Sequence, residues 1–99
     1  MKHRILLPLS ALLLALALAA PASANCYADY KAKKNNPLRL SYGVIELADP
    51  ACRSKQAAAK AISRRISKGG WTLLNVLSIF GPEGLAQRKA SAGANYLRY

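Results

Sequence analysis

The sequence predicts a small α/β or α+β domain of two layers, a βαβαβ-like arrangement with an extra helical turn at its N-terminus. Three segments carry this prediction. Residues 38–47 alternate between apolar and polar, residues 71–80 form a nearly continuous apolar run, and the alanine-rich segment 51–68 between them contains no glycine or proline. Two strands joined by one helix make a βαβ unit, whose crossover is expected to be right-handed.

The first 24 residues have the three parts of a secretory signal peptide. A basic start, Lys2 to Arg4, precedes an apolar core from Ile5 to about Leu18, and Ala22-Ser23-Ala24 forms an A-x-A cleavage site. The apolar core is shorter than the roughly 20 residues that span a bilayer. We therefore expect cleavage after Ala24 and a periplasmic or secreted protein. An uncleaved membrane anchor is the alternative.

The remaining 75 residues, 25–99, are expected to form a single small basic domain. They hold thirteen lysines and arginines, the fifteen of the chain less Lys2 and Arg4, against four acidic residues, which gives a net charge of +9. A domain of this size has a marginal core and usually needs a covalent or metal staple. Cys26 and Cys52 are the only cysteines, and export would place them in an oxidising compartment, so we predict a disulfide between them. Two free buried thiols are the alternative.

The first two elements precede the predicted helix. Residues 25–36 are expected to form one or two helical turns, stopped before Pro37 because a residue that precedes proline is pushed out of the helical region. Residues 38–47 are predicted to be a strand whose alternation changes frame at Gly43-Val44. Such a change indicates a β-bulge or a strand buried on both faces at its end, and the bulge is the favoured interpretation.

The central helix is predicted to begin at Asp49-Pro50, because aspartate accepts hydrogen bonds at an N-cap and proline suits the first helical position. At 100° per residue one side of this helix is apolar and includes Cys52, so the disulfide would join the start of the domain to the first helical turn. Gly69-Gly70 supplies a left-handed C-terminal cap. The apolar side comprises Cys52, Ala58, Ala59, Ile62 and Ile66, and the opposite, cationic side comprises Arg53, Lys60, Arg64 and Lys68.

The last third of the chain is expected to add a strand, a helix and a short terminal strand. Breakers on both sides of 71–80 and its β-branched and aromatic content favour a buried strand there. Pro82-Glu83 should start a second helix of about ten residues that ends at Gly93, with the carboxylate near the positive end of the helix dipole. Residues 94–99 alternate enough for a third strand, although the helix could instead continue through Leu97.

The residues of 25–99 offer little for catalysis, and we expect no enzyme activity, no metal and no cofactor. The only histidine, His3, belongs to the signal peptide, which removes serine–histidine and cysteine–histidine pairs and most transition-metal sites. Asp49 and Glu83 are expected at helix starts. Asp29 and Glu46 are expected to pair with the surplus of basic side chains rather than to form an acid–base pair.

Charge is the functional signal that remains. A net charge of +9 on a domain of this size favours association with polyanions. In the envelope of a Gram-negative cell these are lipopolysaccharide, anionic phospholipid, peptidoglycan or an acidic protein, whereas the compartment argues against nucleic acid. Contact is predicted at Arg53, Lys60, Arg64 and Lys68, which could equally be an ordinary solvated face.

A second functional hypothesis uses the aromatic residues. In it, the protein is a structural or inhibitory module that presents Trp71, Tyr96 and Tyr99 to one specific partner. The competing interpretation is that these aromatic side chains fill a core that has few other large residues.

The chain also resembles known proteins in several of these segments. The run from Gly69 to Leu85 (GGWTLLNVLSIFGPEGL), with Arg88-Lys89 and the terminal YLRY, is similar to a group of small, exported, uncharacterised proteins of Gram-negative bacteria. The similarity extends to Cys26-Tyr27-Ala28-Asp29-Tyr30-Lys31 and to Cys52 and implies no activity. Tyr42-Gly43-Val44 resembles an aromatic-glycine strand motif of the peptidoglycan-binding SPOR domain, but the second half of that domain's pattern is missing, so no binding residues are transferred.

Overall fold

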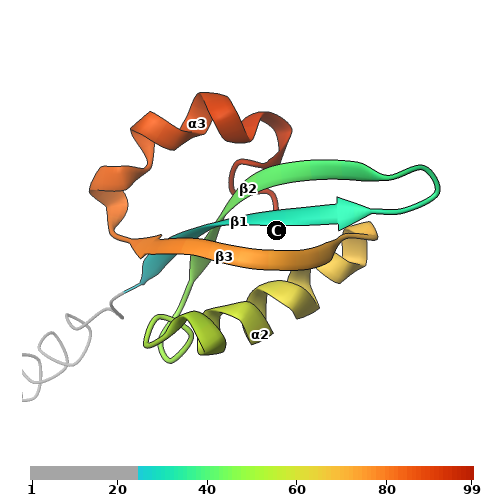
Figure 1. The fold of residues 1–99 in the computed structure, drawn as a ribbon. Helices are drawn as coiled ribbons and strands as arrows, with labels where there is room; N and C mark the ends of the chain where they lie inside the picture. Colours follow the sequence, from blue (N-terminus) through green and yellow to red (C-terminus); the bar gives the residue numbers. More distant parts are fainter. Residues whose placement is uncertain (1–24) are drawn as a thin grey trace, which may run out of the picture.

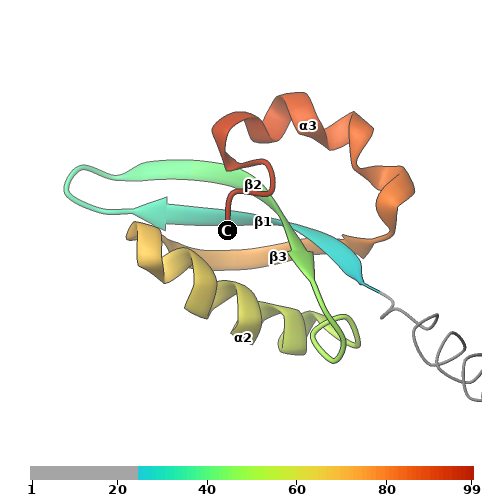
Figure 2. The ribbon, with the colours of Figure 1, turned by 180° about the vertical axis from the view of Figure 1, so that it is seen from behind.

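A computed structural model describes residues 25–99, so the predicted signal peptide lies outside the described residues. Three strands, β1 (Cys26–Lys34), β2 (Arg39–Leu47) and β3 (Thr72–Phe80), form one sheet, with helices α2 (Lys55–Ile66) and α3 (Ala86–Ala92). The strand order is β2-β1-β3. The two helices lie on opposite sides of the sheet, so the prediction of two layers is wrong (Figures 1 and 2). The hairpin that joins β1 to β2 projects past both helices.

The sheet is antiparallel, which makes the protein a small α+β domain. β1 is its central strand and runs antiparallel to both neighbours. β2 and β3 therefore point in the same direction, as a βαβ unit requires, but β1 lies between them.

The prediction of helical turns at 25–36 is wrong. Ala28, Tyr30 and Ala32 are buried and alternate with more polar residues, which is the period of two of a strand, and Asn35–Leu38 is the hairpin turn.

The predicted strand at 38–47 is confirmed as β2, but the bulge expected in it is wrong. Its register with β1 is continuous from Cys26↔Leu47 to Lys34↔Arg39. The frame change instead reflects burial on both faces, because Gly43, Val44 and Ile45 are all buried. Bulges occur in β3: its register with β1 shifts twice, and the shifts leave Leu74 and Leu77 as the extra residues.

The core lies between the sheet and α2. Ala28, Tyr30 and Ala32 of β1 pack with Ile45 and Leu47 of β2, Val76 of β3, and Ala58, Ile62 and Ile66 of α2. The predicted apolar side of this helix is confirmed, since Ala58, Ile62 and Ile66 are its buried residues. Residues four apart share one side of a helix, so this face meets the sheet directly.

The start of α2 was predicted five residues too early. Ser54 is the N-cap, and its Oγ accepts a hydrogen bond from the Ala57 N–H at 3.0 Å. The Asp49 carboxylate turns instead toward Arg53, with 3.5 Å between Oδ1 and Nε, so it caps nothing. At the other end the glycine cap is confirmed, because Gly70 has a left-handed φ of 84° after a single 3-10 turn, Ser67–Gly69.

The predicted disulfide is present between Cys26 and Cys52, whose Cα atoms are 5.9 Å apart. Cys52 lies in the turn that precedes Ser54 rather than in the first turn of the helix. The bridge therefore ties the start of the central strand to the segment that leads into α2. Both half-cystines pack against the core.

The C-terminal part covers one edge of the sheet. Pro82–Gly84 is a 3-10 turn, α3 follows it, and α3 ends at Gly93 as expected. The third strand expected at 94–99 is reduced to one parallel bridge between Val44 and Tyr96, with the Leu97 N–H donating to the Val44 carbonyl at 2.8 Å. This segment therefore pairs with the outer edge of β2 at Val44.

Gly43 gives a test of the packing on the α2 side. An added Cβ would lie 2.4 Å from Cζ and Oη of Tyr30, the largest fully buried side chain. We expect Gly43→Ala to lower the free energy of unfolding by about 1–3 kcal/mol, because the tyrosine would have to leave its position. Urea unfolding measures this, with Ser41→Ala on the same face of β2 as the control. Equal unfolding midpoints for the two variants would contradict the packing described.

Candidate functional site

Three of the predicted cationic residues form a row along the outer side of α2 and of the 3-10 turn that follows it, in which Lys68 lies. Lys60, Arg64 and Lys68 follow one another at intervals of four residues, and all three are exposed. They lie opposite the buried side of the helix, whose residues are also four apart. Arg53 is separate from this row, since it lies in the turn before the helix and faces Asp49. The structure thus brings together three of the four predicted residues, which we call the α2 row.

Most basic side chains of residues 25–99 lack an acidic partner. Of these thirteen, only Arg53 and Arg88 have a side-chain nitrogen within 4.0 Å of an aspartate or glutamate oxygen. Arg65 has an internal role, because its guanidinium donates to the backbone carbonyls of Glu46 and Tyr99. The positive charge of the α2 row is therefore not neutralised within the part of the chain that the structure describes.

The three aromatic residues of the second hypothesis lie in different surroundings. Trp71 and Tyr99 are partly buried and pack against the core on the α2 side, and Lys34 Nζ is 4.6 Å from the centre of a Trp71 ring. Tyr96 lies beside α3, with Lys89 Nζ 5.6 Å from its ring centre. Packing therefore accounts for much of the surface of Trp71 and Tyr99.

Asp29 is the one charged residue among the buried residues of 25–99, and it lies on the side of the sheet away from α2. Its carboxylate accepts hydrogen bonds from Tyr42 Oη at 2.8 Å, Ser78 Oγ at 2.6 Å and Arg88 Nε at 3.0 Å. These four residues, which we call the Asp29 cluster, come from all three strands and α3. The cluster fastens α3 to the sheet.

Arg88 is held by further contacts. Its Nη1 donates to the Gly84 carbonyl at 2.7 Å, and its guanidinium lies 3.9 Å from the centre of the Phe80 ring. The expected pairing of Asp29 with a basic side chain is thus confirmed, although the sequence did not indicate which one. The two residues are 59 positions apart, and Arg88 appeared only as one member of a short helix.

The ionisation of the cluster follows from these contacts. Burial alone would raise the pKa of Asp29, but the hydrogen bonds from Ser78, Tyr42 and Arg88 and the charge of Arg88 together hold that pKa below its ordinary value. Burial, with the hydrogen bond to Asp29 and the negative charge there, raises the pKa of Tyr42 to about 12. Asp29 is therefore ionised and Tyr42 protonated at neutral pH. The charges of Asp29 and Arg88 therefore neutralise each other, and this ion pair is suited to holding α3 in place.

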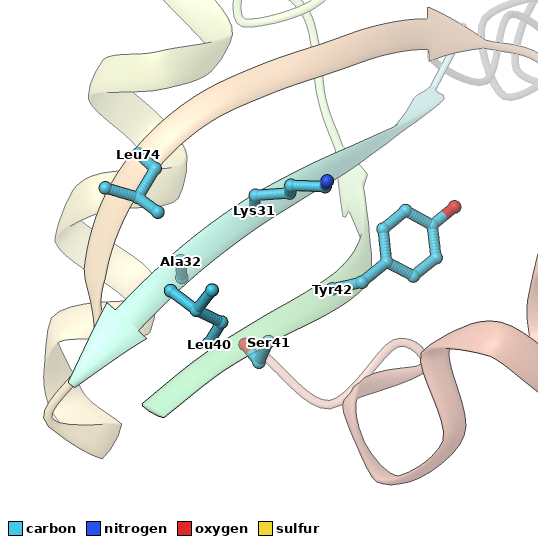
Figure 3. A pocket seen from close by; sticks show the side chains of 6 residues that line it. All are labelled: Lys31, Ala32, Leu40, Ser41, Tyr42 and Leu74. Carbon is cyan, nitrogen blue, oxygen red and sulfur yellow. The ribbon is translucent and has the colours of Figure 1, made fainter. Parts of the chain in front are cut away.

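The same side of the sheet is uncovered toward the hairpin. A hollow of about 240 Å³ lies there, lined by Lys31, Ala32, Leu40, Ser41, Tyr42 and Leu74 (Figure 3). Leu40 and Leu74 are 69% and 48% exposed. Lys31 is the pairing partner of Tyr42, and Lys33 that of Leu40. We call Lys31, Lys33, Leu40 and Leu74 the hairpin face. Sequence reasoning missed it, because it assigned residues 25–36 to helical turns.

Groups suited to acid–base or metal chemistry are sparse among residues 25–99. Asp29 and Glu46 have separate partners, since Glu46 accepts a hydrogen bond from the Asn25 side chain at 2.7 Å. Within the described range, histidine, cysteine, aspartate and glutamate form no group of three or more that could hold a metal ion. None of the helices between residues 25 and 99 has the length and apolar character needed to cross a bilayer.

Comparison with known proteins adds no relative to this description. A scan against protein-family models, a search of curated proteins and a search of solved structures each find no match to the chain.

Proposed function

We propose that the protein is an exported, non-catalytic cationic protein that binds an anionic component of the cell envelope, either lipopolysaccharide, phospholipid or peptidoglycan, or an acidic protein. The α2 row carries this proposal. Its three cations, Lys60, Arg64 and Lys68, are exposed, evenly spaced and without a carboxylate partner in residues 25–99. Removal of residues 1–24 during export is part of the proposal, and the disulfide is compatible with an oxidising compartment.

The strength of such binding depends on how many charges reach the partner. A basic residue near an anionic surface contributes about 1 kcal/mol at physiological ionic strength, and the contribution falls off within a Debye length of about 8–10 Å. Three cations that follow one another at intervals of four residues along α2 and the 3-10 turn after it can meet one surface together. Arg53 is expected to contribute less, because Asp49 already offsets its charge.

A charge-removal series tests the α2 row. Replacement of Lys60, Arg64 and Lys68 by glutamine should weaken retention on isolated envelope fractions by roughly tenfold or more at low salt. The matched control replaces Arg53, Lys89 and Arg98 by glutamine, which removes the same charge from exposed positions outside the row. Equal losses in the two triple variants would refute a role for the row. Binding that resists salt and is lost in Trp71→Ala would favour the aromatic hypothesis instead.

A further inference from the structure

The exposed large apolar side chains of the described residues gather at the hairpin. Four such side chains are exposed, namely Leu38 (64%), Leu40 (69%), Leu74 (48%) and Leu97 (41%). Leu38 lies in the hairpin turn, and Leu40 and Leu74 belong to the hairpin face. Three of the four therefore occur at one end of the sheet, and one of them, Leu38, lies in the hairpin turn, which projects past both helices (Figure 1).

A β-bulge contributes to this gathering. The register of β3 against β1 goes from Lys31↔Asn75 to Ala32↔Leu73, which leaves Leu74 as the extra residue. Bulges redirect side chains and are frequent beside functional sites. Leu74 lines the hollow together with Leu40 (Figure 3). In a regular strand successive side chains point to opposite faces of the sheet, whereas a bulge can place two of them on the same face.

The charges around these leucines are all positive. Lys31, Lys33 and Lys34 end β1, and Arg39 begins β2. The four carboxylates of residues 25–99 lie elsewhere. Asp29 pairs with Arg88 and Glu46 lies opposite Tyr27, while Asp49 and Glu83 belong to turns that follow the far ends of β2 and β3. Residues 31–40 and Leu74, which we call the hairpin end, thus combine exposed leucines with cations that have no acidic residue beside them.

We propose that the hairpin end binds the surface of an anionic phospholipid bilayer. Leu38, Leu40 and Leu74 enter the boundary between headgroups and acyl chains, and Lys31, Lys33 and Arg39 meet the phosphates. This inference rests on the proposed function and names the phospholipid among its anionic partners. Peptidoglycan offers negative charge but no apolar phase for the leucines. In lipopolysaccharide the acyl chains lie beneath a layer of sugars, out of reach of leucines that sit level with the cations.

The geometry of the hairpin suits this mode of binding. Lysine and arginine side chains can keep their charged ends at the phosphates while their methylene chains lie along apolar surface, so leucines and cations at one level are compatible with a headgroup boundary. Because the hairpin turn extends beyond α2 and α3, Leu38 can reach a flat surface before the helices touch it (Figures 1 and 2). Leu40 and Leu74 lie behind it on the side of the sheet away from α2, so the hairpin would meet the surface with this side turned toward it.

Vesicle co-sedimentation tests the inference. The protein is purified from cells that express the full chain, its N-terminus is established by intact mass, and it is mixed with phosphatidylcholine vesicles with and without phosphatidylglycerol. We expect binding only to the anionic vesicles. Leu38→Ser combined with Leu40→Ser should weaken that binding by about tenfold or more. Leu97→Ser, an exposed leucine far from the hairpin turn in sequence, is the matched control and should leave binding unchanged.

A fluorescence measurement reports insertion directly. Trp71 is the only tryptophan, so Leu38→Trp adds one reporter in the hairpin turn. Its additional emission should move to shorter wavelength with anionic vesicles and stay unchanged with phosphatidylcholine alone. Anionic-vesicle binding that is the same in the Leu38→Ser/Leu40→Ser variant and in the parent would overturn the inference.

The outcomes separate this inference from the proposed function. Retention on envelope fractions without binding to phosphatidylglycerol vesicles would overturn the hairpin inference and leave the proposed function standing. Binding to phosphatidylglycerol vesicles that is lost only in the variant without the α2 row would also overturn the hairpin inference and leave the proposed function standing. The absence of retention on any anionic material would remove the proposed function, and the hairpin inference with it.

Discussion

Replacement of Asp29 by alanine is expected to lower the free energy of unfolding by about 3 kcal/mol, because it leaves the partly buried Arg88 without its counter-charge. The side chain of Asp29 is 9% exposed and that of Arg88 22%. Tyr42 and Ser78 would lose their acceptor as well, and buried donors without partners add to the cost. Urea unfolding at neutral pH measures the change.

The matched control for this prediction is Asp49→Ala. Asp49 also pairs with an arginine, but both side chains are more than half exposed. Such pairs contribute about 0–1 kcal/mol, because water and salt screen them. A loss of equal size in Asp29→Ala and Asp49→Ala would show that the Asp29 cluster does not hold α3 to the sheet.

The Asp29 cluster also predicts how stability depends on pH. The folded state holds the pKa of Asp29 below its ordinary value of 3.8. Its contribution to stability is therefore fully present above about that pH and is lost as the pH falls through the folded-state pKa. We expect the free energy of unfolding of the parent to fall on acidification by more than that of Asp29→Ala. Parallel pH profiles would contradict the hydrogen bonds assigned to the carboxylate.

Removal of the disulfide should have an effect of similar size. We expect Cys26→Ser combined with Cys52→Ser to lower the free energy of unfolding by about 3–4 kcal/mol, the loop-closure value for about 27 residues. Domains are typically stable by only about 5–15 kcal/mol, and a chain this short has a small core, so this is a large fraction. Urea unfolding of parent and variant gives the difference.

A reduction experiment provides the control for that prediction. Treatment of the parent with a thiol reductant should move its unfolding midpoint to that of the double variant and leave the variant unchanged. Both cysteines pack against the core, so part of any loss in the double variant comes from packing rather than from the cross-link. A parent that unfolds at the same midpoint with and without reductant would contradict a stabilising role for the bridge.

Much of the fold was predictable because its patterns are local. The strands at 38–47 and 71–80, the apolar side of the central helix and the cap at Gly70 all follow from periodicity and glycine punctuation. The disulfide followed from having only two cysteines. These signals act over a few residues or by elimination, so they did not depend on knowledge of the tertiary contacts.

The central strand was missed because two signals compete in its sequence. Asn35-Asn36-Pro37 was interpreted as a helix stop, whereas it forms a hairpin turn in which Asn36 adopts a left-handed φ of 65°. The alternation of Ala28, Tyr30 and Ala32 with polar residues was the correct guide. Small alanines make that alternation weak, yet they lie at the centre of the sheet beneath α2. This one error also affected the predicted topology. A simple βαβ unit was expected, whereas β1 lies between β2 and β3 and makes the unit a split one.

The candidate sites depended on contacts between distant segments. The charge row on α2 was visible from helical spacing, apart from Arg53, whose turn position depends on where the helix starts. The Asp29 cluster joins residues up to 59 positions apart, and the hairpin face needs both the β1–β2 register and the bulge at Leu74. No local pattern specifies those pairings.

The central claim is that positive charge holds this protein to an anionic partner in the envelope, and a salt series on isolated envelope fractions tests it most directly. Retention of the purified protein should be strong at low salt and largely lost by about 0.5 M, where the Debye length is only a few ångströms. No retention at low salt, or retention that does not change as salt is raised, would contradict the account.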